Sequence, residues 1–356
     1  FKGMSSEITL RKHQVDAIAH TLYGGNTLLA HSVGAGKSFE MIASAMESKR
    51  LGLCHKSLIV VPKAIVAQMS ADFLRLYPTA NILVPKATDF NAENRQKFCS
   101  RIATGNYDAV IISHEQLDKI PLSVEYQTQF IQERLDEIED YLLSTKYAND
   151  SGNRGFTIKQ LESTKKNLEN RLEALNNDDK RDTTITFEEL GVDKIYVDEA
   201  HLFKNKYFNT KMSRVAGIST SAAQRSEGLY MKCRYLDEKT GSRGVVFATG
   251  TPISNSMVEM YTMQTYLQFD ELKRHDLHHF DAWASTFGET VLSFELAPEG
   301  KGYQYKTRFA KFNNIPELMD MFKSVADIKT ADMLDLPTPK ANYHTVAVEA
   351  SEYQKQ

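Results

Sequence analysis

The sequence contains no long hydrophobic run: none of its apolar stretches reaches the ~18 residues that a membrane-spanning helix needs. Cysteine is also scarce, and Cys54, Cys99 and Cys233 are scattered without the spacing of metal ligands. This pattern favours reduced thiols in a cytoplasmic protein over a disulfide framework or a zinc site. A net charge of −3 gives no global basic field, so a nucleic-acid partner would have to meet a local patch of cations. We therefore expect a cytoplasmic protein without a membrane partner.

Residues 31–38 (HSVGAGKS) are typical of a phosphate-binding loop, a Gly-rich turn whose backbone amides cradle phosphate oxygens. The hydrophobic run at 27–30 predicts a strand before this loop, and the apolar spacing of 39–47 predicts a helix after it. The alternative is an ordinary loop and helix N-cap, because Gly-Lys-Ser alone occurs in many proteins. The strand–loop–helix context favours phosphate binding.

The residue types in this loop match the chemistry of ATP binding. Gly34 and Gly36 allow the positive φ and close backbone approach that a phosphate cradle requires. Lys37 would place its ammonium between the β- and γ-phosphates, and the Ser38 hydroxyl would be a ligand of Mg²⁺. His31 departs from the full pattern, which has glycine at that position. The loop residues expected to contact the nucleotide are Val33, Gly34, Ala35, Gly36, Lys37, Ser38 and Phe39.

Strands and helices are expected to alternate around this loop. A helix over 8–22 carries Gln14, whose amide could donate to and accept from an adenine edge, although a plain packing helix is the alternative. Continuous β-branched runs at 57–62 and 108–113 predict strands buried on both faces. The amphipathic helices expected between them cover 65–76 and 91–103. This order predicts an α/β fold with a doubly wound parallel sheet, in which ligands bind at the carboxyl ends of the strands.

Two long segments, 126–143 and 158–175, break the alternation of strand and helix. Both are highly charged with apolar residues at i, i+3 and i+4, and a Gly/Asn-rich turn at 149–155 joins them. They predict an antiparallel helical hairpin inserted at 121–184. The hairpin is either a solvated structural arm or a docking arm for nucleic acid or a partner protein. The sequence does not choose between these two roles.

A short β-run at 193–197 ends directly in Asp198 and Glu199. Two adjacent carboxylates at the end of a buried strand are costly unless a cation or a proton uses them. Together with the phosphate loop they predict an ATPase. Asp198 would hold Mg²⁺, and Glu199 would orient and deprotonate the water that attacks the γ-phosphate. A helix N-cap is the alternative role for Asp198. The expected catalytic residues are therefore Glu199, Asp198 and Lys37.

These motifs, in this order, resemble the first RecA-like lobe of superfamily 2 helicases and translocases, most closely the Swi/Snf-like branch. The resemblance covers roughly 8–120 and 185–270. In this family the position of His31 also carries other residues, so the departure there weighs little. The segments that carry the resemblance are 10–14 (LRKHQ), 31–38, 60–64 (VVPKA), 112–117 (ISHEQL), 198–205 (DEAHLFKN) and 248–256 (ATGTPISNS).

The resemblance implies further roles. His201, Thr249, Gly250 and Thr251 would couple the nucleotide state to the nucleic-acid track, with threonine hydroxyls bridging to His201. A plain Thr-Gly-Thr-Pro turn is the alternative. Backbone phosphates would meet several polar side chains, for which a solvated loop is the alternative. The nucleic-acid contacts expected are Lys63, His114, Lys204, Asn205, Lys206, Lys211 and Arg214.

The expected organisation is a RecA-like P-loop NTPase lobe with a hairpin insertion and a helical C-terminal extension. The lobe would cover 1–120 and 185–270, the hairpin 121–184, a helical protrusion 271–335, and a linker with the start of a second lobe 336–356. By the resemblance, a second RecA-like lobe of the same full-length protein would supply an arginine finger. We therefore expect this chain alone to bind ATP weakly and to hydrolyse it slowly or not at all.

The expected function is that of the ATP-binding lobe of a motor that uses ATP and Mg²⁺ on double-stranded DNA and grips mainly the sugar-phosphate backbone. Similar lobes with such an insertion occur in phage and mobile-element proteins fused to adenine methyltransferases. A restriction or defence setting, with a methyltransferase domain as a partner, is therefore a hypothesis. Two alternatives remain open: RNA as the target, and a nucleotide-dependent protein-interaction module without motor activity.

Overall fold

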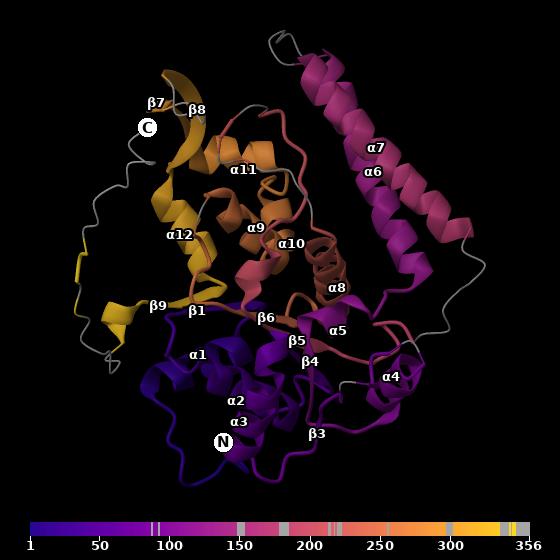
Figure 1. The fold of residues 1–356 in the computed structure, drawn as a ribbon, viewed down its shortest axis with the longest axis vertical. Coiled ribbons are helices and arrows are strands. Elements are labelled where there is room, and N and C mark those ends of the chain that lie inside the picture. Colours follow the sequence, from indigo (N-terminus) through magenta and orange to yellow (C-terminus); the bar gives the residue numbers. More distant parts are fainter. Residues whose placement is uncertain are drawn as a thin grey trace.

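A computed structural model describes most of the chain. The described residues are 1–86, 88–91, 93–147, 154–177, 185–212, 215–216, 218, 223–254, 256–296, 302–334, 342 and 344–346. They form a layered α/β body from which a pair of long helices projects (Figure 1). The expected linker and second-lobe start at 336–356 lies outside the described residues, apart from 342 and 344–346.

Seven parallel strands form the central sheet, in the order β3-β4-β2-β5-β6-β1-β9. Along that order they are Ile82–Leu83, Ala109–Ser113, Ser57–Val61, Lys194–Asp198, Val245–Ala248, Thr27–His31 and Ala326–Lys329. All residues of β1, β2, β4 and β5 are buried, because helices cover both faces of the sheet. The α/β fold with a parallel sheet that the sequence predicts is therefore confirmed. The edge strands β3 and β9 are additions that the sequence pattern did not predict.

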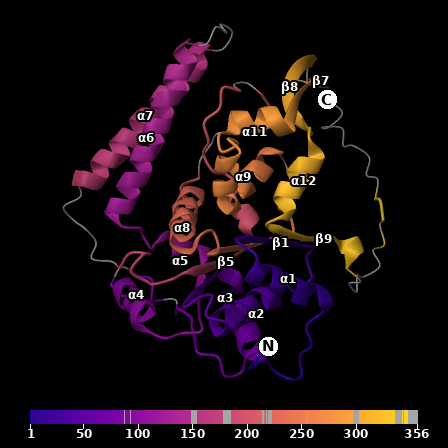
Figure 2. The same ribbon diagram turned by 180° about the vertical axis from the view of Figure 1, so that it is seen from behind.

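The side chains of each strand alternate between two apolar layers. On one face Leu29 and Ile59 pack with α1, α2 and α3. On the other face Leu28 and Leu58 belong to a larger core with the remaining helices, so the first three helices lie on one side and most later ones on the other (Figures 1 and 2). The first layer contains α1 (Lys12–Tyr23), α2 (Lys37–Arg50) and α3 (Val66–Leu76). The second contains α4 (Arg95–Thr104), α5 (His114–Asp118), α8 (Gln224–Thr240), α9 (Val258–Leu267), α10 (Phe269–Arg274), α11 (Phe280–Phe287) and α12 (Ile315–Lys323).

The projecting helices are α6 (Val124–Tyr147) and α7 (Arg154–Asn177), which lie side by side in both views (Figures 1 and 2). Their apolar stripes form a separate small core. Ile131, Leu135 and Ile138 of α6 are buried there against Leu161 and Leu168 of α7. The periodicity that predicted two helices thus also identified the residues that hold them together.

The region after 270 differs from the expected helical protrusion. Besides α10, α11 and α12 it contains an antiparallel ribbon of β7 (Gly288–Leu296) and β8 (Tyr303–Phe312). It also supplies β9, which pairs with β1, so the sheet extends beyond the expected lobe boundary at 270. A four-residue edge strand leaves almost no sequence signal, because its position depends on a partner strand nearly three hundred residues away.

The three cysteines are buried and form no disulfide. Burial raises the pKa of the Cys54 thiol to about 12 and that of Cys99 to about 11, so these groups stay protonated near neutral pH. In the part of the chain that the structure describes, no helix combines the length and the apolar character needed to cross a membrane.

Candidate nucleotide-binding and catalytic site

The predicted phosphate loop connects β1 to α2, as expected. Gly34 and Gly36 have φ values of +87° and +92°, which glycine adopts without strain. A Cβ atom on Gly36 would meet Nε2 of Gln14, so a side chain there would displace the Gln14 amide. Helix α2 begins at Lys37, and no side chain caps the amides of its first turn.

Lys37 folds back over the loop. Its ammonium donates hydrogen bonds to the carbonyl oxygens of His31 (2.9 Å) and Ser32 (3.3 Å). Val33, at the tip of the loop, is 84% exposed. The cation and the loop amides therefore face a common space at the carboxyl end of β1.

Gln14 and His13, at the start of α1, hold the far side of the loop. The Gln14 amide donates to the carbonyl oxygens of Ala35 (3.4 Å) and Gly36 (3.3 Å), and its oxygen accepts from the Arg11 N–H (2.9 Å). Nε2 of His13 lies 2.8 Å from the Ala35 oxygen. Gln14 thus positions the loop, and its predicted contact with adenine stays a prediction.

Asp198 and Glu199 lie at the same edge of the sheet. In the register of the sheet, Asp198 of β5 lies opposite Ala248 of β6, and Ala248 lies opposite Leu29 of β1. Since neighbouring strands are about 4.8 Å apart, the acidic residues and the phosphate loop are about 10 Å apart along the sheet. Burial and the neighbouring Glu199 raise the pKa of Asp198, while the Lys37 ammonium acts in the opposite direction. The two predicted motifs are therefore within electrostatic reach of each other.

His201 connects the acidic residues to the turn after β6. Its Nδ1 lies 3.1 Å from a Glu199 carboxylate oxygen and 3.0 Å from the Thr249 hydroxyl. The Thr251 N–H donates to the same hydroxyl (3.1 Å). The predicted bridge between His201 and Thr249 is present, and Thr251 joins it through its backbone. Gly250 lies against the phosphate loop, where a Cβ would be 3.3 Å from Val33.

His114 is buried, so its predicted contact with nucleic acid is wrong. Its side chain turns inward, and Nε2 donates to the backbone carbonyl of Asp198 at 2.9 Å, because a carbonyl can only accept. The ring lies edge-on to Phe203 with centroids 5.1 Å apart. Burial lowers the pKa of His114 to about 4, so the ring is neutral and positions the end of β5.

Five of the side chains predicted to contact phosphates fall into three groups. Lys63, Asn205 and Lys211 are exposed, as such contacts require. Lys204 forms an ion pair with Glu259 (2.7 Å) and donates to the Ser254 hydroxyl, so its charge serves an internal contact. Arg214 lies outside the described residues.

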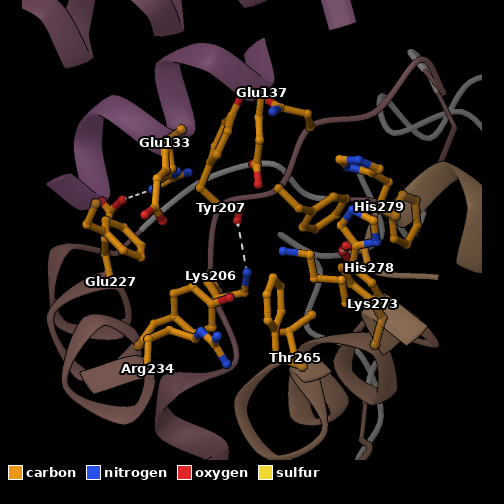
Figure 3. Close-up of a pocket in the computed structure, with 18 of the residues that line it drawn as sticks. Glu133, Glu137, Lys206, Tyr207, Glu227, Arg234, Thr265, Lys273, His278 and His279 are labelled. Atoms are coloured by element: carbon orange, nitrogen blue, oxygen red, sulfur yellow. Dashed lines mark hydrogen bonds and ion pairs between the residues drawn. The ribbon is translucent and has the colours of Figure 1, made fainter. Parts of the chain in front are cut away.

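Lys206, predicted as a phosphate contact, is half-buried in this structure. It points into a cavity of about 370 Å³ between the hairpin and the lobe, where its ammonium lies 4.2 Å from the centroid of the Tyr230 ring (Figure 3). Burial, reinforced by the positive charge of Arg134, lowers the pKa of Lys206 to about 7. A sequence pattern cannot show this inward direction, because the adjoining residues are polar.

The sequence reasoning missed a group of charges beneath the loop. His31 is fully buried between the carboxylates of Glu40 (2.9 Å from Nδ1) and Asp327 (3.1 Å from Nε2). Burial alone would lower the pKa of His31, but the hydrogen bonds to Asp327 and Glu40 outweigh it and raise the pKa to about 8. The departure from the glycine pattern at this position is therefore a structural link between the loop and β9.

Comparisons with known proteins find similar sequences and structures. A family model described as "Probable helicase domain" matches residues 21–330. The chain is similar to "Defense against restriction protein B" of Escherichia phage P1, with 27% identity over 238 residues, which are 65% of this chain and 10% of the phage protein. It thus spans a tenth of that relative.

Two solved structures of a Sulfolobus solfataricus SWI2/SNF2 ATPase core also match, one in complex with dsDNA and one without. They share 15% and 13% identity with this chain at TM-scores of 0.48 and 0.46. The matches cover 92% and 94% of this chain and 46% of each solved chain, so this chain spans less than half of either core.

Proposed function

The chain belongs to the family of probable helicase domains, and on this premise we propose that it is the ATP-binding lobe of an ATP-dependent motor that acts on double-stranded DNA. One observation carries the proposal. The phosphate loop and the Asp198–Glu199 pair lie at one edge of one parallel sheet, and the contact between His201 and Thr249 links that pair to the turn beside the loop.

The donor set of this edge fits ATP with Mg²⁺. No side chain caps the first-turn amides of α2, and the buried Asp198 carboxyl has a raised pKa that a cation would reverse. Lys37 would exchange the carbonyls of His31 and Ser32 for phosphate oxygens. When bound, Mg²⁺ neutralises charge on the transferred phosphate.

The remaining residues of the site would act on water and on geometry. Glu199 would accept a proton from the water that attacks the γ-phosphate, whose bond to the leaving ADP then breaks. His201 holds the Glu199 carboxylate, and His114 holds the peptide of Asp198. His201 and Thr249 would pass changes at the nucleotide to the turn at Gly250 and Thr251.

Nucleotide binding is tested by Lys37→Ala. The variant loses an ionic hydrogen bond to phosphate, worth about 1.5–3 kcal/mol. Its affinity for a fluorescent ATP analogue, measured by titration in the presence of Mg²⁺, should therefore fall by about tenfold or more. Lys63→Ala removes an exposed lysine at the end of β2 and is the matched control, with unchanged affinity expected. Equal affinity in the Lys37→Ala and wild-type proteins would refute the assignment of the loop.

Duplex DNA as the track is supported by the family and by the exposed Lys63, Asn205 and Lys211 at the carboxyl edge and beyond the acidic residues. The similarity to a phage protein named for defence against restriction supports a setting in conflicts over foreign DNA. ATPase stimulation of the full-length protein by duplex DNA, single strands and RNA is the direct test. Stimulation by RNA alone would contradict the proposal.

A further inference from the structure

The ribbon of β7 and β8 has two chemically different faces. Residues paired across an antiparallel ribbon point to the same side, and here Phe294 pairs with Tyr305 and Leu292 with Thr307. Tyr303, two residues before Tyr305, shares that side. One face of the ribbon therefore presents three aromatic rings and a leucine.

These rings are exposed and ordered against one another. Phe294, Tyr303 and Tyr305 are 59%, 67% and 72% exposed. The rings of Phe294 and Tyr303 are nearly parallel, at 15° with centroids 5.1 Å apart, and Tyr305 lies 4.9 Å from Phe294. Together they form a flat aromatic platform in contact with solvent.

The positive charge of the ribbon lies on β8, whereas β7 carries Glu289 and Glu295. β8 carries Lys306, Arg308 and Lys311 and no acidic residue. Lys311 is paired with Glu289 at the base of the ribbon (3.0 Å). Lys306 pairs with Ser293 and Arg308 with Val291, so these two cations point to the side of the ribbon opposite the rings. A two-stranded ribbon is thin, so their field reaches a strand of nucleic acid lying on the aromatic face within the Debye length of about 8 Å at physiological salt.

The base of the ribbon is fixed to the lobe. Phe309 is buried and packs against Phe280 of α11, with centroids 5.9 Å apart. Ala216 exchanges backbone hydrogen bonds with β8, donating to Thr307 O and accepting from Phe309 N–H, both at 2.9 Å. Ala216 belongs to the stretch that runs from the acidic residues past the exposed Lys211. The ribbon is therefore hydrogen-bonded to the chain segment that follows Lys211, a residue to which the proposed function assigns a backbone phosphate.

We propose that the aromatic face of the β7–β8 ribbon binds an unpaired nucleic-acid strand by stacking its bases on Phe294, Tyr303 and Tyr305. Every base has a π-face, so a row of rings binds bases with little sequence preference, while nearby cations attract the backbone. Bases inside a duplex are stacked on one another, so the platform takes a strand only where pairing is open. The inference rests on the proposed motor function for its setting and names a second, single-stranded partner.

The test uses the chain with a fluorescein-labelled 15-nucleotide DNA strand, followed by fluorescence anisotropy. The double variant F294A/Y305A removes two exposed rings that are not part of the buried core. Its affinity should fall by about tenfold or more, the range expected when one or more bases lose an aromatic partner. Tyr23→Ala removes an 81% exposed tyrosine at the end of α1, in the opposite layer, and should leave affinity unchanged.

An abasic strand of the same length separates stacking from charge. It keeps the phosphates but offers no base to any of the three rings. It should therefore bind the wild-type protein at least as weakly as the normal strand binds F294A/Y305A, which keeps Tyr303, and the variant should cause no further loss. An RNA strand of the same sequence, run in parallel, identifies which nucleic acid the platform prefers. Unchanged DNA and RNA affinity in F294A/Y305A would overturn the proposal in favour of a protein partner for the patch.

Photocrosslinking gives a second, positional readout. A strand containing 5-iodouracil should crosslink to Tyr303 or Tyr305, and crosslinks found only elsewhere would overturn the proposal. The binding and crosslinking assays contain no ATP. If Lys37→Ala left ATP affinity unchanged, the proposed motor function would be refuted, but strand binding by the ribbon would stay the same. Failure of the motor proposal and failure of the ribbon proposal are therefore distinguishable.

Discussion

Two buried histidines lie near the same edge of the sheet, one beneath the phosphate loop and one beneath the acidic residues. His31 lies between two carboxylates, and its pKa is raised to about 8. His114 faces the carbonyl of Asp198, and its pKa is lowered to about 4. The same side chain, buried in both places, is therefore a cation in one and a neutral donor in the other.

The difference comes from the partners. Burial lowers the pKa of both rings, because it penalises the charged form. At His31 the ionic hydrogen bonds to Glu40 and Asp327 raise the pKa by more than burial lowers it. At His114 the single hydrogen bond to a carbonyl does not offset the effect of burial. The nearby His201 and Arg225 further disfavour a proton on His114. One half of the site is therefore held by charge and the other by a neutral hydrogen bond.

The largest effect is expected from His31→Ala. Removing the cation leaves Glu40 and Asp327 buried without it, which should lower the free energy of unfolding by about 3–5 kcal/mol. His55→Ala is the matched control. His55 also bonds an aspartate, Asp193, but its side chain is 91% exposed, so the loss should stay below about 1 kcal/mol. Urea unfolding at pH 7 measures both, and similar losses would contradict the ionic role of His31.

His114 should destabilise the fold on the acid side. Its pKa rises from about 4 in the folded chain to about 6.5 in the unfolded chain, so the unfolded chain gains protons first as pH falls. Stability present above pH ~6.5 is then lost between pH ~6.5 and ~4, by about 3 kcal/mol. In His114→Gln, whose amide keeps a donor but does not titrate, this part of the loss should disappear from the pH series. Identical pH curves for wild type and variant would show that His114 is not neutral in the fold.

A smaller effect of opposite sign is expected from His31 on the alkaline side. Its pKa is higher in the folded chain, so its contribution is complete below pH ~6.5 and is lost as pH rises through about 8, by about 2 kcal/mol. Asp327→Asn removes one of the two carboxylates that raise this pKa. The alkaline loss should therefore shrink in that variant, and an unchanged loss between pH 6.5 and 9 would be evidence against the ion pair.

Local patterns predicted the parts of the site that depend on local structure. Gly34 and Gly36 require a left-handed backbone wherever the loop forms, and the runs that became β1 and β5 are buried strands in any parallel sheet. The contact between His201 and Thr249 followed from two motifs at the ends of neighbouring strands.

The features that the sequence did not predict depend on side-chain direction or on contacts between distant parts of the chain. His114 and Lys206 were assigned to the surface by residue type, but their neighbours turn them inward. Asp327 meets His31 across 296 positions of sequence, in a strand of four residues. The aromatic face of β7 and β8 follows a period of two that was visible in the sequence but lay in a region expected to be helical.

The pairing of β9 with β1 has a mechanical consequence. A pull directed along β9 would load its hydrogen bonds to β1 together, in shear, instead of opening them one after another. The ion pair between His31 and Asp327 resists the same sliding motion. Such a pull would therefore be delivered to β1, the strand that leads into the predicted phosphate loop.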